Sequence, residues 1–392
     1  MSTIIGLTGN EAVAEAMRQI NPDVVAAYPI TPQTELMHKF ADFVANGKVD
    51  TEMILVESEH SAMSASVGAA AGGARAMTAT CANGLALMWE IVYIAASLRL
   101  PIVMAVVNRA LSGPINIHND HSDSMGCRDS GWIQIYSENS QEAYDNTIMA
   151  VKIAENKDVL LPVMVTLDGF ILSHTLERIE ILDDKQVREF IGEYIPQNHL
   201  LDINHPVTIG PLDLQDYYFE HKRQEAEAIN NALEVVEEVS FEYSRLTGRN
   251  YDVLELYRME DAERAIVALG STAGTVKFTV DSLRENGEKV GMIKLRLFRP
   301  FPYKEIYEAL KNVKSFAVLD KCISFGYGGP VYGEIKSALY NYQAFIPAVN
   351  YIYGLGGRDI KPTSIKKVFD ELKHITKEGV NGKLIHYLDV RE

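Results

Sequence analysis

The strongest constraint on the fold is an alternation of short apolar runs with segments in which apolar residues recur every three or four positions. The apolar runs predict strands at residues 23–29, 52–58, 75–81 and 100–108. The periodic segments predict helices at residues 11–20, 34–47, 59–74 and 84–99. Strands separated by helices run parallel in a sheet whose two faces are covered. We therefore expect an α/β fold with a doubly wound sheet.

A second alternation of the same kind begins near residue 262. Its expected strands fall within residues 262–271, 289–298, 314–320 and 348–357, and its expected helices within 272–287, 302–313, 329–341 and 363–375. Residues 176–220 are polar and predict an extended connector, and residues 221–246 predict one long helix. We expect two doubly wound domains, 1–180 and the smaller 255–392, joined by residues 181–254 as a connector with the long helix.

Composition limits the classes of function. The net charge of -16 argues against a nucleic-acid-binding protein, because phosphate binding requires clustered Lys and Arg. The three cysteines, Cys81, Cys127 and Cys322, are too few for an iron–sulfur cluster and too scattered for a disulfide framework. We see neither a signal-peptide pattern in residues 1–17 nor an apolar run of about 18 residues, so we expect a cytoplasmic protein without a membrane span.

In open parallel sheets, ligands bind beyond the carboxyl ends of the strands. The first such exit is "YPITPQTE", residues 28–35. Pro29 and Pro32 restrict their neighbours and remove backbone donors, so the loop is stiff and presents the hydroxyl of Thr31. The alternative is a rigid strand-to-helix turn in which Thr31, Gln33 or Thr34 caps the helix.

The second exit, "VESEHSA", contains Glu59 at the expected start of a helix. Its carboxylate is either an ordinary acidic residue in a first helical turn or a buried group that hydrogen-bonds a cofactor nitrogen. The small-residue helix that follows, 59–74, either packs tightly on its own sheet or contacts another subunit.

The longest exit, "NRALSGPINIHNDHSDS", begins with Asn108 and Arg109. A guanidinium there could pair with a substrate carboxylate, or it could tie down its own loop through Asp120 or Asp123. His118, Asp120, His121 and Asp123 are potential metal ligands, but their spacing matches no structural zinc site, and a loop closed by its own hydrogen bonds is the preferred interpretation.

No P-loop and no GxGxxG fingerprint follows a strand, which disfavours a nicotinamide dehydrogenase. The glycine-rich segments 324–330 and 354–359 follow expected strands of the second half. Each either forms a tight turn or binds an anion through backbone N–H groups.

Together these segments resemble one family. "YPITPQTE", "VESEHSAMSASVGAAAGGARAMTAT", "GLALMWE", "RLPIVMAVVNRALSGPINIHNDHSDSM" and "LRLFRPFP" are similar, in the same order, to α subunits of the 2-oxoacid:ferredoxin oxidoreductase family, in its pyruvate branch. The resemblance covers almost the whole chain. It implies a thiamine-diphosphate pyrimidine-binding domain followed by a domain like the C-terminal domain of transketolase.

The resemblance also implies cofactors and partners. Thiamine diphosphate would be shared with a β subunit that holds the diphosphate and Mg²⁺, with no metal on this chain. Iron–sulfur clusters would lie in partner subunits of a complex with β, γ and δ chains, and ferredoxin would accept the electrons. Coenzyme A would be the co-substrate that takes the acetyl group from pyruvate.

Five site residues follow from the same resemblance. Glu59 matches the glutamate that hydrogen-bonds N1′ of the aminopyrimidine and is the expected catalytic residue. Tyr28 and Ile30 are expected to contact the cofactor with it. Thr31 and Arg109 match residues that bind the substrate. The arginine of the family binds the carboxylate of the substrate.

Two alternatives stay open from the sequence. The chain could belong to a relative that acts on 2-oxobutyrate, 2-oxoisovalerate or an aryl-pyruvate, since much of the pocket would come from β. It could instead be a non-catalytic α/β scaffold, although the joint presence of Thr31, Glu59 and Arg109 argues against that.

Overall fold

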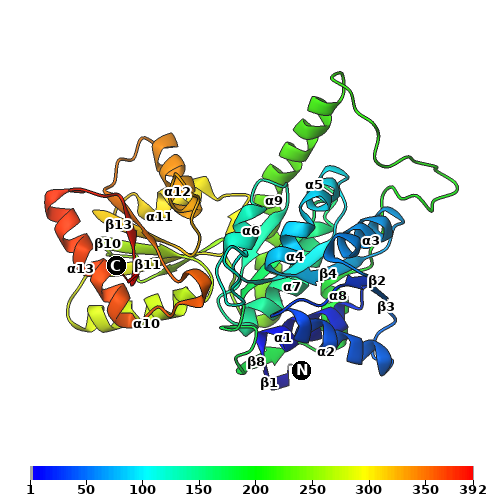
Figure 1. Cartoon of the computed structure of the whole chain (residues 1–392), viewed down its shortest axis with the longest axis horizontal. Coiled ribbons are helices and arrows are strands. Elements are labelled where there is room, and N and C mark those ends of the chain that lie inside the picture. Colours follow the sequence, from blue (N-terminus) through cyan, green and yellow to red (C-terminus); the bar gives the residue numbers. More distant parts are fainter. Residues whose placement is uncertain (1–2, 392) are drawn as a thin grey trace.

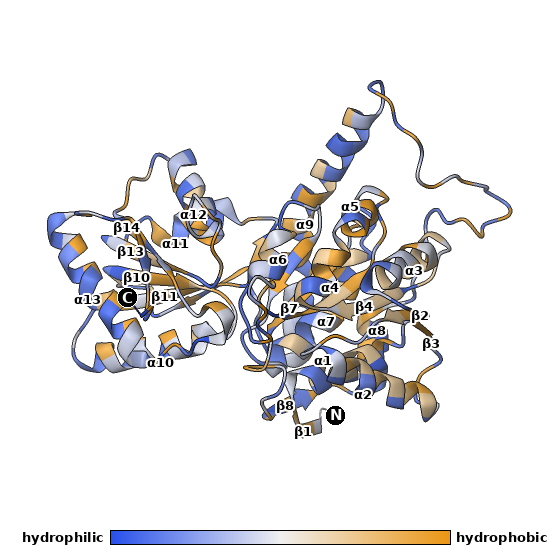
Figure 2. Ribbon diagram, in the orientation of Figure 1, coloured by the Kyte–Doolittle hydropathy of each residue, from blue (hydrophilic) through white to orange (hydrophobic). Residues whose placement is uncertain are grey.

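The computed structural model describes residues 3–391, which form an α/β protein with two open, mainly parallel sheets (Figure 1). Residues 1, 2 and 392, at the outer ends of the two expected domains, lie outside the described residues. Apolar residues concentrate on the strands of both sheets (Figure 2). Among the described residues, no helix is long and apolar enough to span a membrane.

The first sheet has seven strands in the order β12-β6-β7-β5-β4-β2-β3. Its strands are β2 (Val24–Ala27), β3 (Glu52–Leu55), β4 (Ala76–Thr80), β5 (Val103–Asn108), β6 (Ile133–Tyr136), β7 (Val163–Asp168) and β12 (Leu297–Arg299). All neighbours are parallel except β12, which is antiparallel to β6. The expected doubly wound sheet is confirmed.

Helices cover both faces of this sheet, which explains the continuous apolar strands. They are α1 (Gly9–Ile20), α2 (Thr34–Ala45), α3 (Glu59–Ala71), α4 (Ala82–Leu87), α5 (Trp89–Ser97), α6 (Ser122–Gly126) and α7 (Ser140–Ala154). Along β5, Val103 and Val107 enter the core shared with α1 and α7, whereas Met104 and Val106 enter the core beneath α3 and α5. Such strands are apolar on both faces because neither face meets water.

The second sheet has six strands in the order β15-β14-β13-β10-β11-β9, with β9 antiparallel to β11. Its strands are β9 (Leu254–Tyr257), β10 (Arg264–Ala268), β11 (Val290–Leu295), β13 (Ser315–Asp320), β14 (Ala348–Ile352) and β15 (Ile385–Tyr387). Its helices are α10 (Thr272–Glu285), α11 (Tyr303–Leu310), α12 (Pro330–Asn341), α13 (Pro362–Glu378) and the 3₁₀ turn η1 (Leu355–Gly357).

The expectation of an extended connector over residues 176–220 is wrong for its first part. β8 (Glu177–Ile181) pairs antiparallel with β1 (Thr3–Leu7), and α8 (Asp184–Ile191) follows. The helix forms because Asp183 and Gln186 make a capping box at its start. Residues 192–217 lack regular structure and form a long arm. Part of the arm extends from the body (Figure 1), and part packs against it, as at Leu200 and Ile209.

The expected single strand over 289–298 is divided between the two sheets. β11 ends at Leu295, and β12 begins at Leu297 on the edge of the first sheet. Arg296 lies between them, 1 % exposed, and its Nε donates to Asn146 Oδ1 at 2.9 Å. The domain boundary at residue 255 stays a prediction. β12 follows this residue in the sequence but belongs to the first sheet.

The long helix α9 (Tyr218–Thr247) is anchored through a buried carboxylate. Asp145 of α7 accepts hydrogen bonds from the hydroxyls of Tyr243 and Tyr251, both at 2.5 Å, and pairs with Arg249 Nε at 2.7 Å. The Asp145 side chain is fully buried. A buried charge of this kind is tolerated because its lone pairs are all satisfied.

Replacing this carboxylate should loosen the helix. Asp145→Ala leaves Arg249 without its buried partner, which should cost about 3 kcal/mol and lower the midpoint of thermal unfolding by several degrees. The matched control is Asp158→Ala, since Asp158 is exposed. Calorimetry that gives the same midpoint for both variants would contradict the assigned role of Asp145.

Candidate functional site

Neighbouring strands β2, β4 and β5 bring their carboxyl ends to one edge of the first sheet. The chain leaves β2 at Tyr28, β4 at Cys81 and β5 at Arg109. Parallel strands end at the same edge, so these exits meet although they are far apart in the sequence.

The turn after β2 is held by two buried amides. Gln33 Nε2 donates to Ala79 O of β4 at 3.1 Å, and Asn10 Nδ2 donates to Pro32 O at 2.9 Å. Gln33 occupies the N-cap position of α2 but makes no capping hydrogen bond with its side chain. The alternative that this stretch exists to cap the helix through Gln33 is therefore wrong.

Thr31 is exposed at this edge, and its backbone carbonyl accepts hydrogen bonds from residues that follow β4 and β5. Thr31 O accepts hydrogen bonds from Arg109 Nη1 at 2.8 Å and from the Cys81 thiol at 3.2 Å. Tyr28 and Ile30 are half-buried on the same turn. The structure thus brings Tyr28, Ile30, Thr31 and Arg109 together.

The Arg109 side chain is 7 % exposed and donates to two backbone carbonyls. Besides Thr31 O, it reaches Asn116 O from Nε at 3.1 Å. It does not pair with Asp120 or Asp123, as one interpretation of the loop required. Within residues 3–391, its hydrogen bonds engage Nε and Nη1, so the Nη2 donors are free for a ligand.

Asp123 shapes the loop from beneath. Its buried carboxylate accepts from the backbone N–H groups of Ala82 at 2.9 Å and Arg109 at 3.0 Å, and from Asn108 Nδ2 at 2.8 Å. Burial raises the pKa of Asp123 above its ordinary value, and these donors oppose the shift. One carboxylate thereby joins the exits of β4 and β5.

Glu59 is the first residue of α3 and is 8 % exposed. A Cβ on Gly84 would lie 2.8 Å from Glu59 Oε1 and 2.5 Å from Thr80 Oγ1, so the absent side chain of Gly84 makes room for the carboxyl group. Thr80 Oγ1 is buried and has no hydrogen-bond partner among the described residues. A buried carboxyl group beside an unsatisfied hydroxyl fits a polar ligand at this position.

Of the four candidate metal ligands of the long loop, Asp120, His121 and Asp123 hydrogen-bond to separate protein partners. His121 Nε2 lies 2.8 Å from Asp168 Oδ1, and Asp120 Oδ1 accepts from Ser122 N at 2.9 Å. A different acidic cluster, Glu138, Glu142 and Glu255, surrounds Lys294 Nζ at 2.5 to 2.7 Å. Lys294 and Lys277 together offset most of the negative charge of this cluster, so the cluster carries no metal argument.

Sequence reasoning missed the residues that support the site. Gln33, Asn10 and Cys81 hold the turn of Thr31. Asn116 supports Arg109. Gln33 and Asn116 lie inside the quoted motifs, which was a usable signal, whereas Asn10 lies on α1 and only the tertiary fold brings it to this turn.

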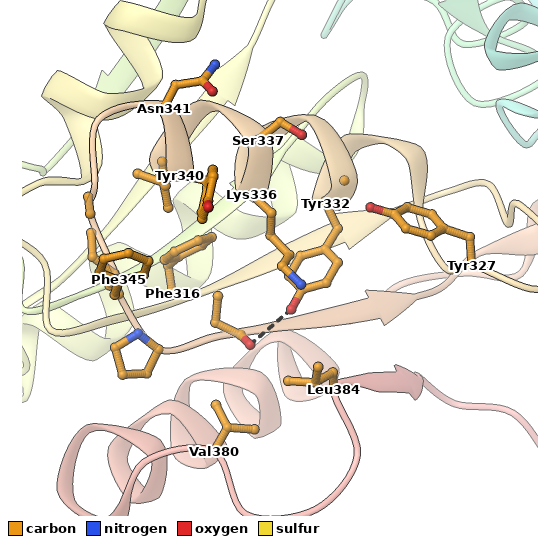
Figure 3. Close-up of a pocket in the computed structure, with 16 residues that line it drawn as sticks. Phe316, Tyr327, Tyr332, Lys336, Ser337, Tyr340, Asn341, Phe345, Val380 and Leu384 are labelled. Carbon is orange, nitrogen blue, oxygen red and sulfur yellow. Dashed lines mark hydrogen bonds between the residues drawn. The ribbon is translucent and has the colours of Figure 1, made fainter.

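A groove of about 650 Å³ lies elsewhere, between α12 and the segment before β15 (Figure 3). Its walls are mainly aromatic or apolar and include Phe316, Tyr340, Phe345 and Leu384. Lys336 is the charged side chain among its lining residues. The groove lacks the convergent polar groups found at the strand exits, so we place the candidate site at the edge of the first sheet.

Comparison with known families decides the assignment. Residues 15–240 match the model described as "Pyruvate flavodoxin/ferredoxin oxidoreductase, thiamine diP-bdg", and residues 262–365 match "Pyruvate:ferredoxin oxidoreductase core domain II". The chain belongs to the pyruvate:ferredoxin oxidoreductase family. The resemblance seen in the sequence is confirmed, and the first sheet is the thiamine-diphosphate-binding fold of this family.

Individual relatives of the family agree over the full length. The chain is 61% identical to the pyruvate synthase subunit PorA of Thermotoga maritima, over 99% of this chain and 98% of that protein. It is 51% identical to PorA of Methanocaldococcus jannaschii, over 94% of each chain. It is 45% identical to the ketoisovalerate oxidoreductase subunit VorA of Pyrococcus abyssi, over 95% of this chain and 94% of that protein.

A solved structure supports the fold. A 2-oxoglutarate:ferredoxin oxidoreductase from Magnetococcus marinus, solved with 2-oxoglutarate, coenzyme A and succinyl-CoA bound, matches with a TM-score of 0.73 at 20% identity. The match covers 95% of this chain and 65% of that chain, so this chain spans just under two thirds of its length.

Filling the space beside Glu59 should disturb cofactor binding. In Gly84→Ala the new Cβ meets Glu59 and Thr80, so we expect thiamine diphosphate to bind the assembled complex at least about tenfold more weakly. Gly68→Ala on α3 is the control, because a Cβ there meets nothing within 4 Å. Calorimetric titration would contradict the assignment if both variants bound with the parent affinity.

The thiol at this edge should be inert. Burial, with Asp123 adding to it, raises the pKa of Cys81 to about 12. At pH 8 the group is protonated, so alkylation at Cys81 should be at least about 1,000-fold slower than in the urea-unfolded chain. Peptide mapping by mass spectrometry measures both rates. Similar rates in the two states would show that the thiol is not buried as described.

Proposed function

We propose that this chain is the α subunit of a multi-subunit pyruvate:ferredoxin oxidoreductase. The complex would convert pyruvate and coenzyme A to acetyl-CoA and CO₂, with electrons passing through iron–sulfur clusters to ferredoxin, and could run in reverse as a pyruvate synthase. The observation that carries the proposal is the convergence of Thr31, Glu59 and Arg109 at one sheet edge in a chain 61% identical to a pyruvate synthase subunit.

Glu59 would hold the aminopyrimidine ring of thiamine diphosphate, with Tyr28 and Ile30 beside it. Bound thiamine diphosphate supplies the electron sink for cleavage of the bond between the oxo carbon and the carboxylate. Glu59 would hydrogen-bond the ring nitrogen N1′ and fix the protonation state of the ring. The role requires a carboxyl group at a set position, and the space left by Gly84 supports it.

Arg109 and Thr31 would position the 2-oxo acid. The Nη2 donors of Arg109 suit a carboxylate oxygen, while Nε and Nη1 hold the guanidinium plane against Asn116 O and Thr31 O. The Thr31 hydroxyl is exposed on the same turn and would add one hydrogen bond to the substrate. Such fixed donors act by holding one pose of the substrate.

Partner subunits would complete the site. Exposed apolar side chains flank it on α4, α5 and the long loop, namely Leu87, Trp89, Leu111, Ile115 and Ile117. The arm also carries exposed apolar residues, namely Ile195, Leu200, Leu201, Ile203, Leu212, Leu214 and Tyr217. Such surfaces are typical of protein interfaces. We propose that β covers the site with the diphosphate and Mg²⁺, and that the iron–sulfur clusters lie in β and in a small ferredoxin-like chain of a cytoplasmic complex with β, γ and δ subunits.

A second candidate substrate has a specific observation behind it, the 45% identity to a ketoisovalerate oxidoreductase subunit. The identity to pyruvate synthase subunits is higher, at 61% and 51%. We therefore expect the reconstituted complex to have a larger kcat/KM for pyruvate than for 2-oxoisovalerate or 2-oxobutyrate. A larger kcat/KM for 2-oxoisovalerate or 2-oxobutyrate than for pyruvate would show that pyruvate is not the preferred substrate.

Removing the acid at position 59 tests the mechanism. In the complex, Glu59→Gln keeps the shape of the side chain but loses its carboxyl group, so pyruvate-dependent reduction of a viologen dye should fall by on the order of 100-fold or more. Glu57→Gln is the matched control, because Glu57 is an exposed carboxylate two residues earlier. Parent activity in Glu59→Gln would refute the proposed role.

A further inference from the structure

We propose that Asn116 and the glycine turn Gly354–Gly357 position Arg109, so that the second sheet sets how the active site grips the 2-oxo acid. The inference rests on the proposed function of Arg109 and deepens it. Asn116 is a positioning residue in this scheme, because it touches Arg109 and not the substrate.

The first link joins Arg109 to Asn116. The guanidinium Nε donates to the backbone carbonyl of Asn116 at 3.1 Å. With the bond from Nη1 to Thr31 O at 2.8 Å, this contact fixes the plane of the guanidinium. A fork of fixed orientation can bind a carboxylate in one pose. A shift of the Asn116 carbonyl would therefore turn the guanidinium of Arg109 out of the orientation that suits the substrate carboxylate.

The second link joins Asn116 to the second half of the chain. Its Nδ2 donates to Gly356 O at 3.0 Å, and its Oδ1 accepts from His118 N at 2.7 Å. Both ends of the amide are used, so the side chain has one orientation. The hydrogen bond from Gly356 N to Asp120 Oδ2, at 3.3 Å, adds a second tie between the same two loops.

The third link is steric. Gly356 has a φ of +62°, and a Cβ there would lie 2.4 Å from Asn116 Nδ2. Gly357 has a φ of +81°, and a Cβ there would lie 2.4 Å from His118 Cβ. Glycine is required on both counts, since other residues are strained at positive φ and no room exists for a side chain. The turn is thus built to bring its backbone onto the loop of Arg109.

The turn itself has a firm base. It follows β14, and Tyr353 N just before it donates to Asp320 O of the adjacent strand β13 at 3.1 Å. Lys321, the next residue after β13, accepts at its carbonyl from His121 N at 2.8 Å. The second sheet therefore holds the loop of Arg109 at two points, at Asn116 and at His121. For this reason, a change in the second sheet would affect substrate binding as well as the stability of the fold.

The test compares three variants of the assembled complex. Asn116→Ala removes the amide bridge, and Gly356→Ala forces the turn away from Asn116. We expect each to raise KM for pyruvate on the order of tenfold, as for the loss of one hydrogen bond to a charged group, with kcat changed less and thiamine diphosphate affinity unchanged. Gly379→Ala is the control, because its φ is also positive, +76°, but a Cβ there meets nothing.

A cycle with Arg109→Gln separates this inference from the proposed function. If Arg109→Gln raises KM and Asn116→Ala adds nothing further in the double variant, the two residues act as one unit, as proposed. If Arg109→Gln raises KM but Asn116→Ala matches the parent, the positioning role is wrong and the proposed function stands. If Arg109→Gln leaves KM unchanged, both fail. If Gly356→Ala does not fold, the KM of Asn116→Ala for pyruvate alone decides whether the positioning role is correct.

Discussion

The buried carboxylate of Asp168 is the interaction on which the site depends. It lies at the end of β7 and pairs with Lys321 Nζ at 3.0 Å and His121 Nε2 at 2.8 Å, and it also accepts from Ser271 N at 3.2 Å. Burial alone would raise the pKa of Asp168, but Lys321 and His121 hold it well below its ordinary value. The group joins the first sheet, the loop that contains Arg109, and two strand exits of the second sheet. Removing Lys321 would take away the lysine ammonium group that pairs with this buried carboxylate.

From the sequence, the sheet edge at which the candidate residues lie could be predicted. Apolar runs separated by helical patterns imply parallel strands, and parallel strands place their exits together, so Thr31, Glu59 and Arg109 could be assigned to one edge. The family resemblance is the source of the roles proposed for them. What remained open from the residues alone, such as whether Arg109 ties its own loop, was a question of side-chain direction, which periodicity does not contain.

The remainder depended on contacts between distant segments. The division of residues 289–298 between β11 and β12 could not be predicted from the apolar run, because strands of the two sheets have the same composition. The edge strand β8 and the short helix α8 were missed because short, partly exposed elements differ little from loops in their pattern. Asn116 was passed over because its importance comes from Gly356, 240 positions away.

We propose, in sum, that this chain supplies one wall of a thiamine pocket that a neighbouring chain completes. A structure of the assembled complex with thiamine diphosphate bound is the most direct test. We expect the Glu59 carboxyl group to lie within hydrogen-bonding distance of N1′ of the aminopyrimidine, with the diphosphate and Mg²⁺ bound by the neighbouring chain. A structure in which Glu59 lies away from the subunit boundary and from any cofactor would contradict it.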